Sequence, residues 1–100
     1  MKAKLVFREK NLLEDGSIVE LVLWELPLKT KDRPHGYKCR LYFGDGEGNC
    51  LVRYYNESGK GDHKHIGENE ISYKFVDKDK LIEYFYHDVI CCRENKRIKP

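Results

Sequence analysis

Polar and apolar residues alternate in several short segments over the first half of the chain. Residues 2–8 place apolar side chains at nearly every second position, which predicts an amphipathic strand. Residues 18–26 are apolar on both alternating faces, which is typical of an interior strand. Residues 37–43 and 50–55 alternate again on either side of the glycine-rich segment 44–49, so they predict an antiparallel hairpin.

Two further short strands and one helix are predicted in the second half. Residues 62–66 and 71–76 have strand character, whereas the apolar residues that follow recur at helical spacing up to Arg93. Asp77 stands directly before this helix as an N-cap. In the first half, the Asp15-Gly16 pair favours a tight reversal, which joins the first two strands in a hairpin.

The expected fold class is α+β: an antiparallel sheet of about five to six strands with a C-terminal helix packed on one face. The helix stripe is expected to cover the sheet face that carries Cys39, Leu41, Phe43 and Val52. The opposite face stays uncovered. Residues 1–92 form a single α+β domain in this interpretation, and residues 93–100 form a basic tail that frays.

Composition restricts the class of protein. The 100 residues are 40% hydrophobic and 36% charged, which excludes a chain disordered by composition. The longest mostly apolar run, residues 18–28, is shorter than the roughly 20 residues of a membrane-spanning helix. The first residues carry no secretory signal, so we expect a cytoplasmic protein. The four cysteines lack C-x-x-C spacing, and we expect them to be reduced.

The net charge of +2 is small, but it is unevenly distributed. Residues 29–40 hold five lysines and arginines against Asp32 alone, whereas residues 11–28 hold four carboxylates and no cation. A local cationic zone attracts a polyanion over about one Debye length, roughly 8 Å at physiological salt. The alternative is an ordinary solvated loop.

Residues 56–65 concentrate chemistry that no core-building rule explains. If residues 62–66 are extended, His63 and His65 project from the same face, and Asp62 and Lys64 point away from it. Lys60 stands between two glycines, which let the backbone approach a ligand closely.

Three chemistries fit this segment. The first is RNA cleavage without a metal or cofactor, in which His63 and His65 transfer protons and Lys60, Arg40 or Arg53 stabilises the charge on the phosphate. The ribose 2′-hydroxyl supplies the nucleophile in that reaction.

The second chemistry is a divalent metal site made by His63, His65 and Asp62 or Glu57. The third is binding alone, in which cations contact phosphates and tyrosines stack on bases. The nucleic-acid-binding candidates are Lys38, Arg40, Tyr42, Arg53 and Tyr55. Trp24 is expected in the core, and His35 in a loop.

Several motifs together resemble the TumE-like family, the small toxins of prokaryotic toxin-antitoxin systems. The specific part is Gly59-Lys60-Gly61-Asp62-His63-Lys64-His65, preceded by Arg53-Tyr54-Tyr55-Asn56-Glu57. Weaker matches are Trp24-Glu25-Leu26-Pro27 and Pro34-His35-Gly36-Tyr37-Lys38. The resemblance implies a growth-inhibiting toxin that a helix-turn-helix antitoxin binds and silences. Lys60, Asp62, His63 and His65 match the family pattern.

The sequence therefore predicts a toxin that is a metal-independent endoribonuclease, with His63, His65 and Lys60 as catalytic residues. The alternatives are a non-catalytic inhibitor that binds nucleic acid or the ribosome, and a metal-dependent nuclease. We expect a helix-turn-helix antitoxin and RNA as partners and no contact with a membrane. The RNA target, the acid and base assignment and the oligomeric state stay open at this stage.

Overall fold

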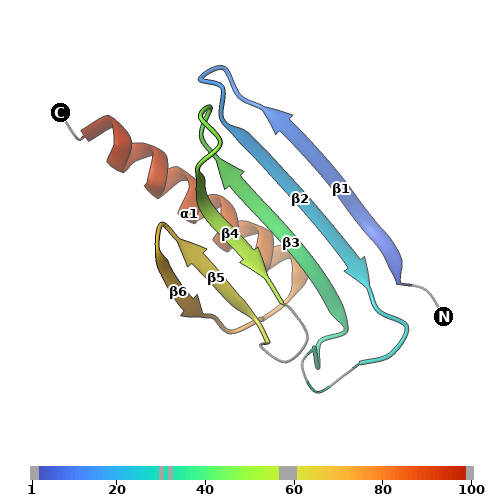
Figure 1. The fold of residues 1–100 in the computed structure, drawn as a ribbon. Helices are drawn as coiled ribbons and strands as arrows, with labels where there is room; N and C mark the ends of the chain where they lie inside the picture. Colours follow the sequence, from blue (N-terminus) through green and yellow to red (C-terminus); the bar gives the residue numbers. More distant parts are fainter. Residues whose placement is uncertain (1–2, 30, 32, 57–60, 99–100) are drawn as a thin grey trace.

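The protein is described by a computed structural model that covers residues 3–29, 31, 33–56 and 61–98. Six strands precede one helix (Figure 1). The strands are β1 (Lys4–Leu12), β2 (Ile18–Glu25), β3 (Tyr37–Gly44), β4 (Cys50–Tyr55), β5 (His63–Ile66) and β6 (Asn69–Ser72). The helix is α1 (Lys78–Ile98).

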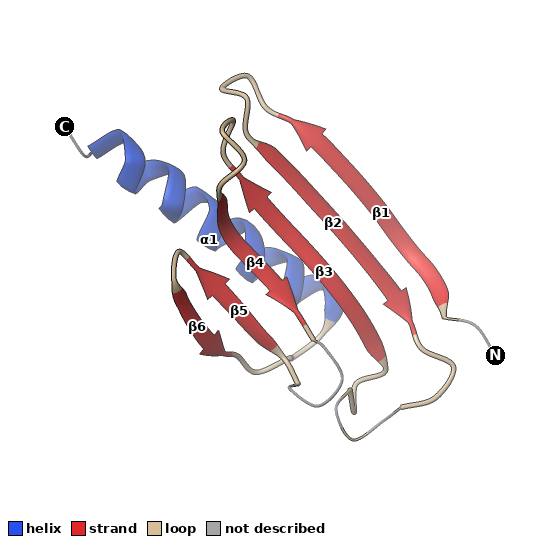
Figure 2. Ribbon diagram, viewed as in Figure 1, coloured by secondary structure: helices blue, strands red, loops and turns tan. Residues whose placement is uncertain are grey.

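The strands form one antiparallel sheet in sequence order, from β1 at one edge to β6 at the other. Helix α1 lies against one face of this sheet, behind β3 and β4 (Figure 2). The predicted α+β class and the interior position of residues 18–26 are confirmed. The predicted turn is also confirmed, since Gly16 has a φ of 87° and Asp15 accepts a hydrogen bond from the Ser17 amide.

The core lies between α1 and the sheet face that it covers. Leu81, Phe85 and Val89 of the helix pack against the apolar side chains of β2, β3 and β4. The sheet side of this cluster comprises Val19, Leu21, Leu23, Cys39, Leu41, Phe43, Val52 and Tyr54. The face predicted for the helix is therefore the one that it covers. Asp77 caps the helix as predicted, because its Oδ1 accepts a hydrogen bond from the Lys80 amide at 2.8 Å.

Three elements differ from the sequence prediction. Strand β1 extends to Leu12, beyond the predicted residues 2–8, and pairs with β2 along its whole length. The last strand is Asn69–Ser72, not residues 71–76, because the turn at Gly67 returns the chain at once to pair with β5. Tyr73 and Phe75 pack against the core instead, as the chain crosses toward the helix. The helix continues to Ile98, through most of the segment predicted as a basic tail. The apolar stripe shows only where the helix stops packing on the sheet. The helix itself continues, because no helix-breaking residue lies between Lys78 and Pro100.

Lys64 lies on the helix side of β5, as predicted from the alternation. Its ammonium nitrogen is 3.0 Å from Asp88 Oδ2 on α1, and the hydroxyl of Tyr54 donates a hydrogen bond to the same carboxylate. These contacts join the end of the sheet to the helix. Within the described part of the chain, no helix combines the length and the apolar character needed to cross a membrane.

Candidate active site

The helix-free face, the sheet face opposite α1, carries two adjacent rows of polar side chains. Antiparallel partners point to the same face, so the register defines both rows. One row runs across β3 to β6 through Arg40, Tyr55, His63 and Ser72. The other runs through Tyr42, Arg53, His65 and Glu70. The folded chain therefore brings both predicted histidines together with four of the five predicted nucleic-acid-binding residues.

Tyr55 lies at the centre of these rows. Its hydroxyl shares a hydrogen bond of 2.6 Å with Nε2 of His65. Its ring meets the edge of the His63 ring, with 3.8 Å between the ring centroids. The Arg53 guanidinium carbon lies 4.4 Å above the Tyr55 ring centroid. Two imidazoles and a guanidinium thus all contact one phenol, that of Tyr55.

His63 is buried, with only 4% of its surface exposed. The Nδ1–H of its ring donates to the Gly61 carbonyl at 2.8 Å, so the neutral ring has a bare Nε2. That nitrogen is 3.4 Å from Glu70 Oε1 and makes no hydrogen bond to a described residue. Solvent therefore reaches little of His63, whose ring packs against the Tyr55 ring.

His65 remains accessible, with 29% of its side chain exposed. Its Nε2 is 3.7 Å from the same Glu70 oxygen, so one carboxylate stands beside both imidazoles. Either ring forms an ion pair with Glu70 once it carries a second proton. Of the two predicted histidines, His65 is the one that a substrate on the helix-free face can touch.

Asp62 points away from the two histidines toward the start of β3. Its Oδ1 accepts a 2.9 Å hydrogen bond from His35 Nε2 and a 3.2 Å bond from Asn56 Nδ2. The Tyr37 amide donates to His35 Nδ1, so the proton of the neutral His35 ring is on Nε2. In this arrangement the Asp62 carboxylate is therefore not grouped with His63 and His65. Among all residues that the structure describes, no three His, Cys, Asp or Glu side chains are grouped to hold one.

His35 and Asn56 are site-supporting residues that the sequence reasoning missed. Asn56 is buried, accepts a hydrogen bond from the Cys39 amide and donates one to the Tyr37 carbonyl. The His35 ring stacks on Phe75, with 3.9 Å between centroids. The available signal was the position of Asn56 directly after a predicted strand. A polar side chain that is buried at such a position must be hydrogen-bonded.

The remaining candidates lie in different places. Lys60 and Glu57 fall outside the described residues. The Tyr42 hydroxyl lies over Gly44, where any Cβ would collide with it, and burial raises the pKa of this phenol. Lys38 is exposed, and its ammonium lies 5.3 Å from the ring centroid of Trp24.

A basic pocket of about 320 Å³ adjoins this cluster. Its lining comprises Trp24, Arg33, Lys38, Cys39, Arg40, Tyr55 and Asn56. Tyr55 belongs both to the pocket and to the histidine cluster. The sequence-based expectation that Trp24 lies in the core is wrong, because the side chain is half-buried and borders this pocket.

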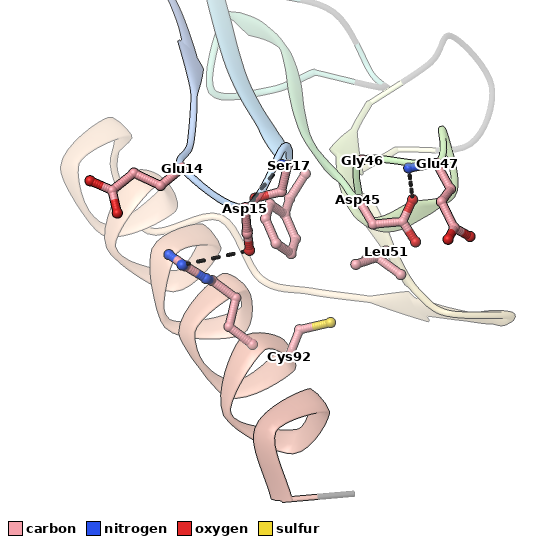
Figure 3. A pocket seen from close by; sticks show the side chains of 10 residues that line it. Glu14, Asp15, Ser17, Asp45, Gly46, Glu47, Leu51 and Cys92 are labelled. Atoms are coloured by element: carbon pink, nitrogen blue, oxygen red, sulfur yellow. Dashed lines mark hydrogen bonds and ion pairs between the residues drawn. The ribbon is translucent and has the colours of Figure 1, made fainter. Parts of the chain in front are cut away.

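A larger pocket of about 590 Å³ lies at the other end of the sheet, between two hairpin turns and the late part of α1 (Figure 3). Four carboxylates line it, those of Glu14, Asp15, Asp45 and Glu47. Hydrogen bonds from Ser17 lower the pKa of Asp15, and Arg93 is 3.8 Å from this carboxylate. An acidic pocket repels a polyanion, so the smaller basic pocket is the relevant one for nucleic acid.

A comparison with protein families supports the resemblance found in the sequence. The sequence model of the family described as Toxin TumE matches residues 2–91. The chain belongs to the TumE toxin family. No curated protein and no solved structure matches it. The protein is thus a toxin, and membership of this family implies an antitoxin partner.

Proposed function

We propose that this toxin is an endoribonuclease that cleaves RNA without a metal ion and thereby stops the growth of the prokaryotic cell that makes it. It acts in the cytoplasm, and a helix-turn-helix antitoxin silences it by binding. The observation that carries the proposal is the 2.6 Å contact between the Tyr55 hydroxyl and His65 Nε2, beside the Arg53 guanidinium on the helix-free face.

These groups match the requirements of cleavage by the ribose 2′-hydroxyl. A base removes the 2′-hydroxyl proton, the oxygen attacks the adjacent phosphorus, and the bond to the 5′-oxygen breaks. The leaving 5′-oxygen takes a proton from an acid, so the products are a 2′,3′-cyclic phosphate and a 5′-hydroxyl. Each positioned acid or base contributes roughly 10²- to 10⁴-fold in rate.

His65 is the acid–base residue that touches RNA in this proposal, and Tyr55 is its hydrogen-bonded partner. Arg53 and Arg40 are exposed in the two rows and stabilise the charge that builds on the phosphate. Lys60, one residue before Gly61, adds a further cation at the phosphate. A guanidinium suits this task because it keeps its charge at every relevant pH.

His63 has a different place in the proposal. Its buried ring contacts Tyr55 edge-on and stands beside Glu70, so it is a positioning residue that fixes both side chains. His63→Gln is expected to shift the pH profile of cleavage and to change the affinity for RNA only slightly. A purely structural role would change protein stability and leave that profile in place.

The test is incubation of the purified protein with total RNA, with and without a chelator. His65→Ala should lower cleavage roughly 10²- to 10⁴-fold and restore growth to cells that express the toxin. His87→Ala is the matched control, because this exposed histidine lies on α1, away from the helix-free face. Cleavage that a chelator abolishes, or that His65→Ala leaves intact, would refute the mechanism. RNA binding without cleavage would favour the non-catalytic inhibitor.

A further inference from the structure

Trp24 occupies an unusual position for a large aromatic side chain. It lies near the end of β2, opposite Lys38 on β3, on the helix-free face. Its ring is half-buried and forms one wall of the basic pocket. Because the core is built on the other face, packing against α1 does not explain this residue.

The charge of the pocket is entirely of one sign. Its described lining residues include two lysine or arginine side chains that are exposed to solvent, Lys38 and Arg40, and no carboxylate. Arg40 reaches Glu20 only at 3.4 Å, and 56% of its side chain remains exposed. Both cations can therefore turn toward an anion that enters the pocket.

We propose that this pocket binds one unpaired base of a single RNA strand, with the Trp24 indole as the stacking platform and Lys38 and Arg40 at the flanking phosphates. The proposal rests on the proposed function and specifies its substrate as single-stranded. Stacking on an aromatic ring beside cations is the general mode by which proteins hold single strands.

The size and position of the pocket favour a single base. A volume of about 320 Å³ is at the lower end of the range for small-molecule sites, which is roughly 300–1,000 Å³. Tyr55 forms the wall of the pocket on the side of His65. A base in the pocket therefore places its neighbouring phosphate beside Tyr55 and His65. A paired base has both faces stacked within the duplex and offers none to the indole.

Lys38 now lies 5.3 Å from the centre of the Trp24 ring. This cation–π contact is weak where the side chains are exposed, and a base that stacks on the indole displaces the ammonium. The flexible side chain of Lys38 then points to a phosphate oxygen. The same two residues thus account for stacking and for charge neutralisation.

Trp24 is the only tryptophan of the chain, so its fluorescence reports directly on the pocket. The probe is a short oligothymidylate, which lacks the 2′-hydroxyl and therefore cannot be cleaved by the proposed reaction. We expect it to quench the emission at saturation. The same strand in a duplex should not, and thymidine monophosphate should require at least about tenfold higher concentration, because it lacks the second flanking phosphate.

Variants test the assignment of each contact, with affinity measured by the anisotropy of a labelled oligothymidylate. Trp24→Ala should weaken binding by about 5- to 100-fold, and Trp24→Phe should retain most of it. Lys38→Ala should weaken binding and reduce its dependence on salt. The controls are Tyr84→Ala and Lys80→Ala, two exposed positions on α1, which should bind as the unchanged chain does.

The outcomes separate this inference from the proposed function. Quenching by the single strand and loss of affinity in Trp24→Ala support the pocket, even where no RNA is cleaved. Equal quenching by duplex and single strand, tight binding of the monophosphate alone, or unchanged affinity in folded Trp24→Ala would overturn it. Cleavage that needs His65 but not Trp24 would leave the endoribonuclease standing and the pocket refuted.

Discussion

His35 Nε2 donates a 2.9 Å hydrogen bond to Asp62, and this contact joins the loop before β3 to the residue before β5. Both side chains are largely buried, with 10% and 14% exposed. Asp62 therefore supports the position of β5, on which the two histidines of the candidate site stand. This role of Asp62 in the fold does not require contact with RNA.

Removing the Asp62 carboxylate should destabilise the fold. Asp62→Ala leaves the His35 Nε2–H without its acceptor and removes one of the two hydrogen bonds that the Asn56 amide nitrogen donates, so the free energy of unfolding should fall by about 1–3 kcal/mol. Urea titration followed by circular dichroism measures this. Glu68→Ala, at an exposed turn position, is the control and should change stability by less than about 0.5 kcal/mol. Equal stability of the two variants would show that the contact contributes nothing.

The Tyr55 hydroxyl should matter for cleavage more than for folding. Tyr55→Phe keeps the ring that packs on His63 and removes only the group bonded to His65, so we expect the cleavage rate to fall about 10²-fold or more. The rate constant on a defined RNA, measured across pH, tests this. Tyr84→Phe on α1 is the matched control. A rate equal to that of the unchanged toxin would remove Tyr55 from the proposed mechanism.

The ion pair between Lys64 and Asp88 should couple the sheet to α1. The pair is partly buried, at 20% and 15% exposure, and Tyr54 donates to the same carboxylate. A double-mutant cycle with Lys64→Met and Asp88→Asn should give a coupling energy of about 0.5–3 kcal/mol. The exposed pair of Lys80 and Glu83 provides the comparison, with about 0.2–0.5 kcal/mol expected. Coupling no larger than that in the exposed pair would contradict this interpretation.

The buried thiol of Cys39 should make the protein sensitive to alkali. Burial raises its pKa from 9.0 to about 12, because the thiolate loses its hydration. The stability contributed by the protonated thiol is present below pH 9 and is lost as the pH rises toward 12. At pH 10.5 the loss is about 2 kcal/mol for this group.

Comparing the free energies of unfolding at pH 8 and pH 10.5 tests this effect. The decrease should be smaller in Cys39→Ala than in the unchanged chain. Burial also raises the pKa of Tyr54 and Tyr73, so part of the decrease should remain in the variant. Identical decreases in the two proteins would rule out a contribution from Cys39.

Most of the fold follows from local patterns in the sequence. Alternation predicted β2, β3 and β4 within one residue at each end, because each strand buries one or both faces and its apolar residues mark them. The Asp77 cap predicted the start of α1 for a similarly local reason. The same pattern failed for β6, whose four residues are all exposed, because nothing in the core constrains their side chains.

The candidate site shows where local reasoning ends. The sequence by itself determined that His63 and His65 share a face and that Lys64 points away, since the two-residue period of a strand needs no partner. Only the tertiary structure decided that Tyr55 lies between the two rings, that Asp62 bonds to His35, and that Trp24 borders a pocket. Those relations depend on the register of neighbouring strands and on which face α1 covers, and both are set by contacts between residues far apart in the chain.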